Sequence, residues 1–398
     1  MIRAPAVLAA AAAAAAACAP QAPSTVDQVR KIADEVIPKV EEAVGLTFRL
    51  PPTIDVRTRE QVERYLIHRL DEEYPADRMV HLAAAYRRFG VIPDTLDLRA
   101  LLLAVLAEQV VGYFDPDSAT LYVVDGTDPL KIRLVLAHEL VHALQGQYLP
   151  LDSIMASEGP NDTRMAAQAV LEGQATLASF AAILDAEQLG RLGNFWRDLR
   201  GQIRGEQEQM PIFAGAPLIL REGLLFPYLA GADFIQWFQR AYPDTHPYGP
   251  RLPRSTEQIL HPEKYRAGDA PIDLALSSTV GDPLFEDNWG EFETRLVLQQ
   301  LTGSESLGTA GALGWGGDRY ALYDAQGSDA LVWWSVWDSP AAADKFAGML
   351  QRHWPTRAQP GRRWRVDRLE VDGRPAVRLV DAPDGWVGWA TIPDVVIR

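Results

Sequence analysis

The spacing of apolar side chains predicts a mainly helical N-terminal region. Apolar residues recur every three or four positions between Val26 and Gly45, which is the period of an amphipathic helix. Thr58 and Gln61 have the spacing of a capping box, so a second helix is expected from there to Leu70. The same period predicts further helices over residues 76–88, 96–110, 129–147, 163–189 and 288–300.

The period changes to that of strands at two places. Residues 110–114 and 120–124 are rich in β-branched and aromatic side chains, and the Asp115 to Ser118 segment between them is typical of a turn. Beyond residue 320 the pattern predicts two strands, a helix over 339–352 and three short strands that end at Trp389. We therefore expect an α+β protein: a mainly helical domain with a short β-hairpin, and a small C-terminal α+β domain.

The Gly/Ser-rich stretch at 303–317 is interpreted as the boundary between these domains. It divides the chain into a domain over residues 19–303 and a second over residues 304–398. The segment before residue 19 has a different character. It carries one positive charge at Arg3 and then an uncharged, alanine-rich run, which is typical of an export signal.

Cys18 decides how this first segment is interpreted. Residues 15–18 resemble a bacterial lipobox, in which a lipidated cysteine becomes the new N-terminus after cleavage. The resemblance implies that residues 1–18 are a lipoprotein signal peptide, and that a lipid on Cys18 holds the exported protein at a membrane of the cell envelope. The alternatives are cleavage at Ala17-Cys18-Ala19, which would give a secreted protein, and an uncleaved alanine-rich helix.

Composition and charge narrow the classes of function. Apolar residues make up 47% of the chain and charged residues 23%, as in an ordinary globular protein. With 38 Lys plus Arg against 53 Asp plus Glu, the net charge of −15 argues against nucleic acid as a partner, and the basic run at 352–365 is interpreted as a solvated surface. Because Cys18 is the only cysteine, any metal must be held by histidine and carboxylate side chains.

The strongest chemical signal is the segment His138-Glu139-Leu140-Val141-His142 within an apolar helix. Two histidines four residues apart lie on one helical face, where they can share a Zn²⁺ ion. Glu139 lies about 100° around the helix from His138, which suits a general base better than a ligand. The alternative is a core helix with two hydrogen-bonded histidines, although burying them without partners would cost several kcal/mol.

A catalytic zinc site needs a third protein ligand and leaves one position for water. A metzincin-type third histidine is absent, because Tyr148 stands six residues after His142. Glu172 lies on the next long helix within an alanine-rich stretch that would permit close approach of two helices. The sequence therefore predicts one Zn²⁺ per chain, held by His138, His142 and Glu172.

A hairpin, an HExxH helix and a second helix that supplies a glutamate together resemble the gluzincin class of zinc metallopeptidases. Residues 108–147, 169–176 and 255–265 resemble a little-characterised, often exported bacterial branch of this class. The resemblance implies a zincin-like fold and hydrolysis of peptide bonds. Several gluzincins carry an acidic residue four positions after the ligand glutamate, but Thr176 stands there in this chain.

The class also uses a Tyr, His or Arg side chain to stabilise the oxyanion, and His261 and Tyr265 are candidates for that role. Ser255 could instead cap a short helix that precedes a turn at His261. We expect a peptide or protein substrate, with the strand over 120–124 binding it by edge addition. The rival hypothesis is a non-catalytic binding or assembly lipoprotein of the envelope, in which the zinc helix is structural.

Overall fold

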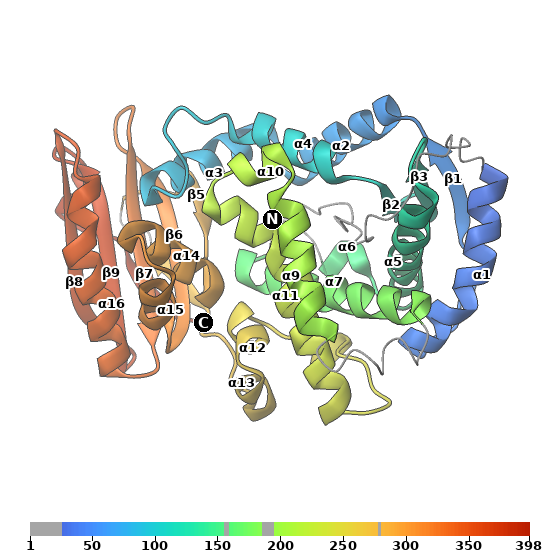
Figure 1. Cartoon of the computed structure of the whole chain (residues 1–398). Coiled ribbons are helices and arrows are strands. Elements are labelled where there is room, and N and C mark those ends of the chain that lie inside the picture. Colours follow the sequence, from blue (N-terminus) through green and yellow to red (C-terminus); the bar gives the residue numbers. More distant parts are fainter. Residues whose placement is uncertain (1–25, 155–158, 185–194, 278–279) are drawn as a thin grey trace.

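A computed structural model describes residues 26–154, 159–184, 195–277 and 280–398. Figure 1 shows helices surrounding a small sheet on one side of the molecule and a larger sheet with its own helices on the other. The predicted α+β class is confirmed. Residues 1–25, including Cys18, lie outside the described residues.

The first helices follow the predicted pattern closely. Thr58 caps α2 with the reciprocal hydrogen bonds of a capping box, because its side chain accepts from the Gln61 N–H and the Gln61 side chain accepts from the Thr58 N–H. Buried apolar residues at helical spacing place α1 against the rest of the core. The bounds are α1 Val26–Val44, α2 Arg59–Glu73, α3 Ala76–Phe89 and α4 Leu98–Gln109.

The predicted hairpin is present, but it belongs to a sheet with a third strand. The strands β2 (Gly112–Asp115) and β3 (Thr120–Val124) pair in antiparallel fashion, and β1 (Thr53–Arg57) pairs with β3 in parallel. The order β1-β3-β2 gives β3 a partner on each side. The prediction that residues 120–124 bind a peptide by edge addition is therefore wrong, since β3 has no free edge.

Three long helices form the centre of the N-terminal region. They are α5 (Pro129–Tyr148), α7 (Asn161–Ile183) and α11 (Leu218–Ala241). At the crossing of α7 and α11, a Cβ atom on Gly173 would collide with the backbone of Gly231. The expected close approach of helices at this stretch is therefore present, and it depends on two glycines.

Further helices connect these three helices to one another and to the second half of the chain. The predicted helix over 163–189 ends at Ile183 in the described part, and its last residues from 185 lie outside it. The connecting elements are α6 Leu151–Ile154, α9 Phe195–Glu208, α10 Pro211–Gly215, α12 Thr256–Leu260 and α13 Pro262–Ala267.

The C-terminal half is built on an antiparallel sheet of order β5-β6-β7-β9-β8. One face packs against helices, and the other packs against the strand pair formed by β4 and β10. The strands are β4 Leu274–Ser277, β5 Phe285–Asp287, β6 Trp315–Asp324, β7 Asp329–Trp337, β8 Arg362–Val371, β9 Arg374–Pro383 and β10 Asp394–Ile397. The helices are α14 Gly290–Thr302, α15 Glu305–Ala312 and α16 Pro340–His353.

These pairings bear on the expected boundary near residue 303. Strands β4 and β5 precede it, yet they pair with β10 and β6, which follow it. The Gly/Ser-rich stretch itself contains α15, which packs on α14. Residues from 274 onward therefore contribute strands to the two sheets of the C-terminal half.

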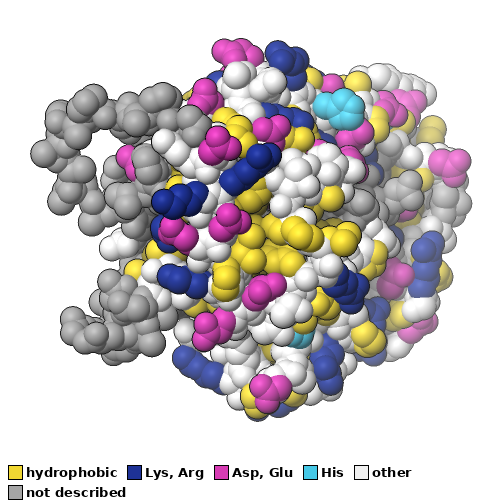
Figure 2. Space-filling view, turned by 90° about the vertical axis from the view of Figure 1, so that its right-hand side faces the viewer, with side chains coloured by type: hydrophobic (Ala, Val, Ile, Leu, Met, Phe, Trp, Pro, Cys, Tyr) yellow, Lys and Arg dark blue, Asp and Glu magenta, His cyan; other side chains and the backbone are white. Residues whose placement is uncertain are grey.

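The molecular surface on the side of α1 is mixed in character. Figure 2 shows hydrophobic side chains near the centre of this face, with acidic and basic side chains interspersed around them. Among the helices that the structure describes, none combines the length and apolar character needed to cross a bilayer.

Candidate metal centre

Three side chains that the sequence places far apart converge on one point. His138 and His142 on α5 bring their Nε2 atoms to 3.1 Å from each other. The Glu172 Oε2 atom on α7 lies 3.1 Å from His138 Nε2 and 3.3 Å from His142 Nε2. We call these three residues the metal-ligand group. It is the only such group of histidine, cysteine and carboxylate side chains within the described ranges.

The donor set fits a zinc ion. Two ligand atoms at about 2.0–2.1 Å from Zn²⁺ in tetrahedral geometry are separated by about 3.3 Å. The three donor separations of 3.1, 3.1 and 3.3 Å form nearly this triangle. Two imidazole nitrogens and one carboxylate oxygen also match the ligand chemistry of zinc hydrolases.

Packing holds the two helices in the position that makes this triangle. The contact between Gly173 and Gly231 brings α11 against α7 beside Glu172. Tyr228 on α11 stacks on the His138 ring, with the ring centroids 6.1 Å apart. The His138 side chain is fully buried, whereas His142 keeps 15% of its side-chain surface exposed. Solvent therefore reaches the group from the His142 side.

The charges of the group depend on one another. Burial lowers the pKa of His138 to about 4, so this imidazole is neutral near pH 7. Burial opposes ionisation of Glu172 as well, but the neighbouring His142 and the hydrogen bonds from both histidines lower the pKa of its carboxyl group. Glu172 in turn raises the pKa of His142 against the effect of burial. The carboxylate is therefore ionised and available to a cation.

Glu139 lies beside this group without joining it. Its Oε2 atom accepts a 2.8 Å hydrogen bond from the Phe114 N–H of β2. Its Oε1 atom is buried and has no hydrogen-bond partner among the described residues. Burial raises the pKa of Glu139 to about 7, which is close to the value that suits a general base at neutral pH. One oxygen is thus fixed by the sheet while the other can exchange a proton.

Sequence reasoning missed the side chains that support the metal-ligand group. His142 Nδ1 lies 2.8 Å from Gln145 Oε1, and Gln145 contacts Gln174, which accepts from the Tyr248 hydroxyl. The sequence did offer one signal for Gln145: it is a polar residue in an apolar helix, three positions after His142, where the two side chains can meet. Thr176 lies on the same helix as Glu172, and its hydroxyl makes no hydrogen bond among the described residues.

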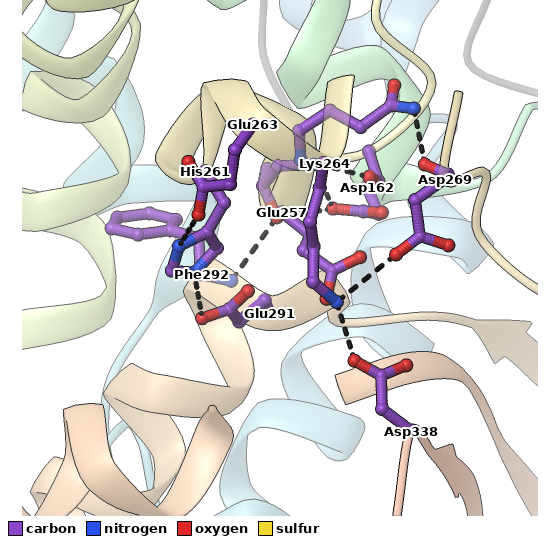
Figure 3. Close-up of polar contacts among 12 residues, drawn as sticks. Asp162, Glu257, His261, Glu263, Lys264, Asp269, Glu291, Phe292 and Asp338 are labelled. Atoms are coloured by element: carbon purple, nitrogen blue, oxygen red, sulfur yellow. Dashed lines mark hydrogen bonds and ion pairs between the residues drawn. The ribbon is translucent and has the colours of Figure 1, made fainter. Parts of the chain in front are cut away.

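The two candidates for stabilising the oxyanion, His261 and Tyr265, bond to residues outside the metal-ligand group. Figure 3 shows His261 between two carboxylates, with His261 Nε2 2.9 Å from Glu291. Tyr265 donates to the Arg251 carbonyl at 2.7 Å and packs edge-on against Phe234. Neither side chain contacts the metal-ligand group in the described structure, so the oxyanion role gains no support. Ser255 caps α12, as the alternative interpretation expects.

Comparisons with known proteins match parts of the chain. A family model described as a domain of unknown function (DUF8575) matches residues 278–391, which is the C-terminal sheet region. A tetraacyldisaccharide 4'-kinase of Nitratidesulfovibrio vulgaris (strain Hildenborough) is 31% identical over 150 residues, covering 34% of this chain and 42% of the relative. The chain thus matches less than half the length of that relative. No solved structure matches the chain.

Proposed function

We propose that the protein is a zinc-dependent peptidase with a gluzincin-like arrangement of its catalytic helices. The observation that carries the proposal is the convergence of His138, His142 and Glu172 beside a buried carboxylate with one unpartnered oxygen, Glu139. A zinc ion bound there would polarise a peptide carbonyl and make a water molecule a stronger nucleophile at neutral pH.

Glu139 is the residue that moves the proton in this proposal. Its Oε1 atom takes a proton from the attacking water while the water oxygen bonds to the carbonyl carbon. The Phe114 N–H keeps the other carboxylate oxygen in place. When the carbon–nitrogen bond breaks, Glu139 returns the proton to the leaving amine, so the products are one new carboxyl group and one new amine.

We propose that an extended substrate pairs with the edge strand β2 instead of with β3. The bond from the Val124 N–H to the Val111 carbonyl makes these residues a hydrogen-bonded pair. By the alternation of an antiparallel ladder, the Gly112 peptide groups and the Phe114 carbonyl point away from β3. A peptide that pairs with β2 would lie next to Glu139, because Phe114 of β2 donates its N–H to the Glu139 carboxylate.

Two other functions are weaker. A structural zinc is normally closed by four protein ligands, and the described residues offer three. A kinase function, suggested by the name of the distant relative, has no support in a phosphate-binding motif, since the sequence contains no G-x-x-x-x-G-K-[ST] segment.

The test is metal content and peptide cleavage by the same purified protein. We expect about one zinc per chain, cleavage of a broad peptide library, loss of cleavage after removal of zinc with a chelator, and recovery when zinc is returned. His142→Ala should lose both zinc and cleavage, whereas His81→Ala, a change far from the group in sequence, should lose neither. Zinc binding without cleavage of any library member would favour the structural-zinc hypothesis.

We also propose that Cys18 is lipidated and anchors the exported protein at the cell envelope. Two or more acyl chains suffice for stable attachment to a bilayer. The wild-type protein should therefore fractionate with membranes, and Cys18→Ala should appear in the soluble fraction. A wild-type protein that is soluble, with a mature N-terminus at another residue, would refute this proposal.

A further inference from the structure

We propose that the side-chain amide of Gln145 is the positioning group for His142, and that it fixes which ring nitrogen of this histidine faces the metal. This inference rests on the proposed function, because it treats His142 as a zinc ligand. Outer hydrogen-bond partners of a ligand histidine set its tautomer and ring orientation. The structure supplies such a partner from α5 itself, three residues after the histidine.

The orientation of the Gln145 amide follows from its partners. One end of the amide lies 3.1 Å from the Leu171 carbonyl oxygen, which can only accept a hydrogen bond. That end must therefore be the nitrogen, Nε2. The other end, Oε1, is then the atom 2.8 Å from His142 Nδ1, so Nδ1 carries the proton and donates it to Gln145. When His142 binds a metal as a neutral imidazole, its lone pair is therefore on Nε2, the atom that faces Glu172 and His138.

The amide is locked from three parts of the chain. Gln145 Nε2 also donates to Gln174 Oε1 at 3.0 Å, and the Tyr248 hydroxyl donates to the same oxygen. Gln145 and Gln174 are 0% and 4% exposed, so water does not compete for these bonds. The chain of bonds thus joins α5, α7 and the segment after α11. A flip of the Gln145 amide would place its oxygen against the Leu171 carbonyl and would remove the hydrogen bonds that its nitrogen donates to Leu171 and Gln174.

The direct test is the zinc dissociation constant of the metal-depleted full chain, measured by competition with a chelator. Gln145→Leu keeps the side-chain volume and removes the acceptor for His142. We expect it to weaken zinc binding by about 10- to 100-fold. The matched control is Gln147→Leu, because Gln147 lies on the same helix but bonds to Arg49 and Leu50 instead. Its dissociation constant should equal that of the wild type.

A spectroscopic measurement separates positioning from general stability. With ¹⁵N-labelled histidine there are only 7 side chains to resolve. In the zinc-loaded wild type, the His142 Nδ1–H should give a proton resonance protected from exchange with water. This resonance should disappear in Gln145→Leu and persist in Gln147→Leu.

A milder variant serves if Gln145→Leu does not fold. Tyr248→Phe removes one hydroxyl at the far end of the chain of bonds and should weaken zinc binding by about 2- to 10-fold, the effect of one hydrogen bond. An unchanged zinc dissociation constant and an unchanged resonance in Gln145→Leu would overturn the role of Gln145 and leave the peptidase proposal standing. If Gln145→Leu does not fold, an unchanged dissociation constant in Tyr248→Phe would do the same. A wild-type protein that binds no zinc would overturn both.

Discussion

Asp318 is the buried carboxylate that joins the C-terminal sheet to α14. It accepts hydrogen bonds from the backbone N–H groups of Trp289 and Gly290, and from the indole N–H groups of Trp315 and Trp333. A carboxylate can accept all four of these hydrogen bonds. A side-chain amide cannot, because its NH₂ end is itself a donor. This residue is therefore a sensitive point for stability.

We expect Asp318→Asn to lower the free energy of unfolding by about 1–3 kcal/mol, since at least one buried donor loses its acceptor. Denaturant unfolding measures this loss. Asp324→Asn on the exposed end of the same strand is the control and should change stability by less than about 0.5 kcal/mol. Equal stability of the two variants would show that the four hydrogen bonds are replaceable.

Among single residues, the sequence predicted those members of the metal-ligand group that can be recognised from their spacing along the chain. His138 and His142 are four residues apart, and helical geometry places them on one face whatever surrounds them. Glu172 needed one further inference, that a helix rich in small residues packs nearby. Gln145 stands three residues after His142, but the orientation of its amide could not be predicted, because its partners Leu171 and Gln174 come from another helix.

The crossing of α7 and α11 is the element-scale feature that positions Glu172. A Cβ atom on Gly173 would meet the backbone of Gly231, and backbone atoms cannot move aside as a flexible side chain can. We expect Gly173→Ala to cost about 1–3 kcal/mol of stability through overpacking, and to weaken zinc binding because α7 must shift. Thermal melting and the zinc dissociation constant measure the two effects.

Gly348→Ala on α16 is the matched control for this change. Gly348 is exposed within the helix, and nothing lies within 4 Å of the position of an added Cβ atom. Alanine favours a helix over glycine by about 0.5–1 kcal/mol, so this variant should be slightly more stable than the wild type. Gly173→Ala with the same gain would contradict the close helix contact.

Helices and strands could be predicted where the hydrophobic period continues over many residues. The order of the strands within a sheet could not be predicted. The hairpin β2–β3 followed from its turn residues, whereas β1 is a five-residue strand beside Pro51 and Pro52 with little signal of its own. Its pairing with β3 spans more than 60 residues of chain. Since this pairing decides which strand has a free edge, that strand could not be identified from the sequence.

Over the whole molecule, buried carboxylates couple stability to pH. Burial raises the pKa of Glu293 from 4.5 to about 8. Between these values the folded protein holds a proton that the unfolded chain has released, so the free energy of unfolding falls as the pH rises. Glu293→Gln should remove part of this decline, by up to about 1.4 kcal/mol per pH unit.

Denaturant unfolding between pH 5 and pH 8 measures the slope for each protein. The exposed Glu305 is the site for a control, and Glu305→Gln should keep the wild-type slope. A Glu293→Gln variant with the wild-type slope would mean that Glu293 is ionised in the folded protein.

The division of the chain at this scale was only partly predictable. The helical and strand-rich regions were visible as a change of period. However, β4 pairs with β10 and β5 joins the five-stranded sheet through pairings that no local pattern encodes. Glycine and serine at 303–317 were interpreted as a domain boundary. In the structure Ser304 caps α15, and Gly308 and Gly311 of this helix lie against α14 and α16. Tertiary packing overrode the local signal there.

The measurement that tests the central claim most directly is the zinc content and cleavage rate of Glu139→Gln beside the wild type. The amide keeps the shape of Glu139 outside the metal-ligand group but cannot take the proton of water, and a general base contributes about 10²- to 10⁴-fold in rate. Glu42→Gln on the exposed face of α1 is the control. We predict a folded protein with about one zinc per chain and a cleavage rate lower by that factor, and cleavage at the wild-type rate would contradict the proposed mechanism.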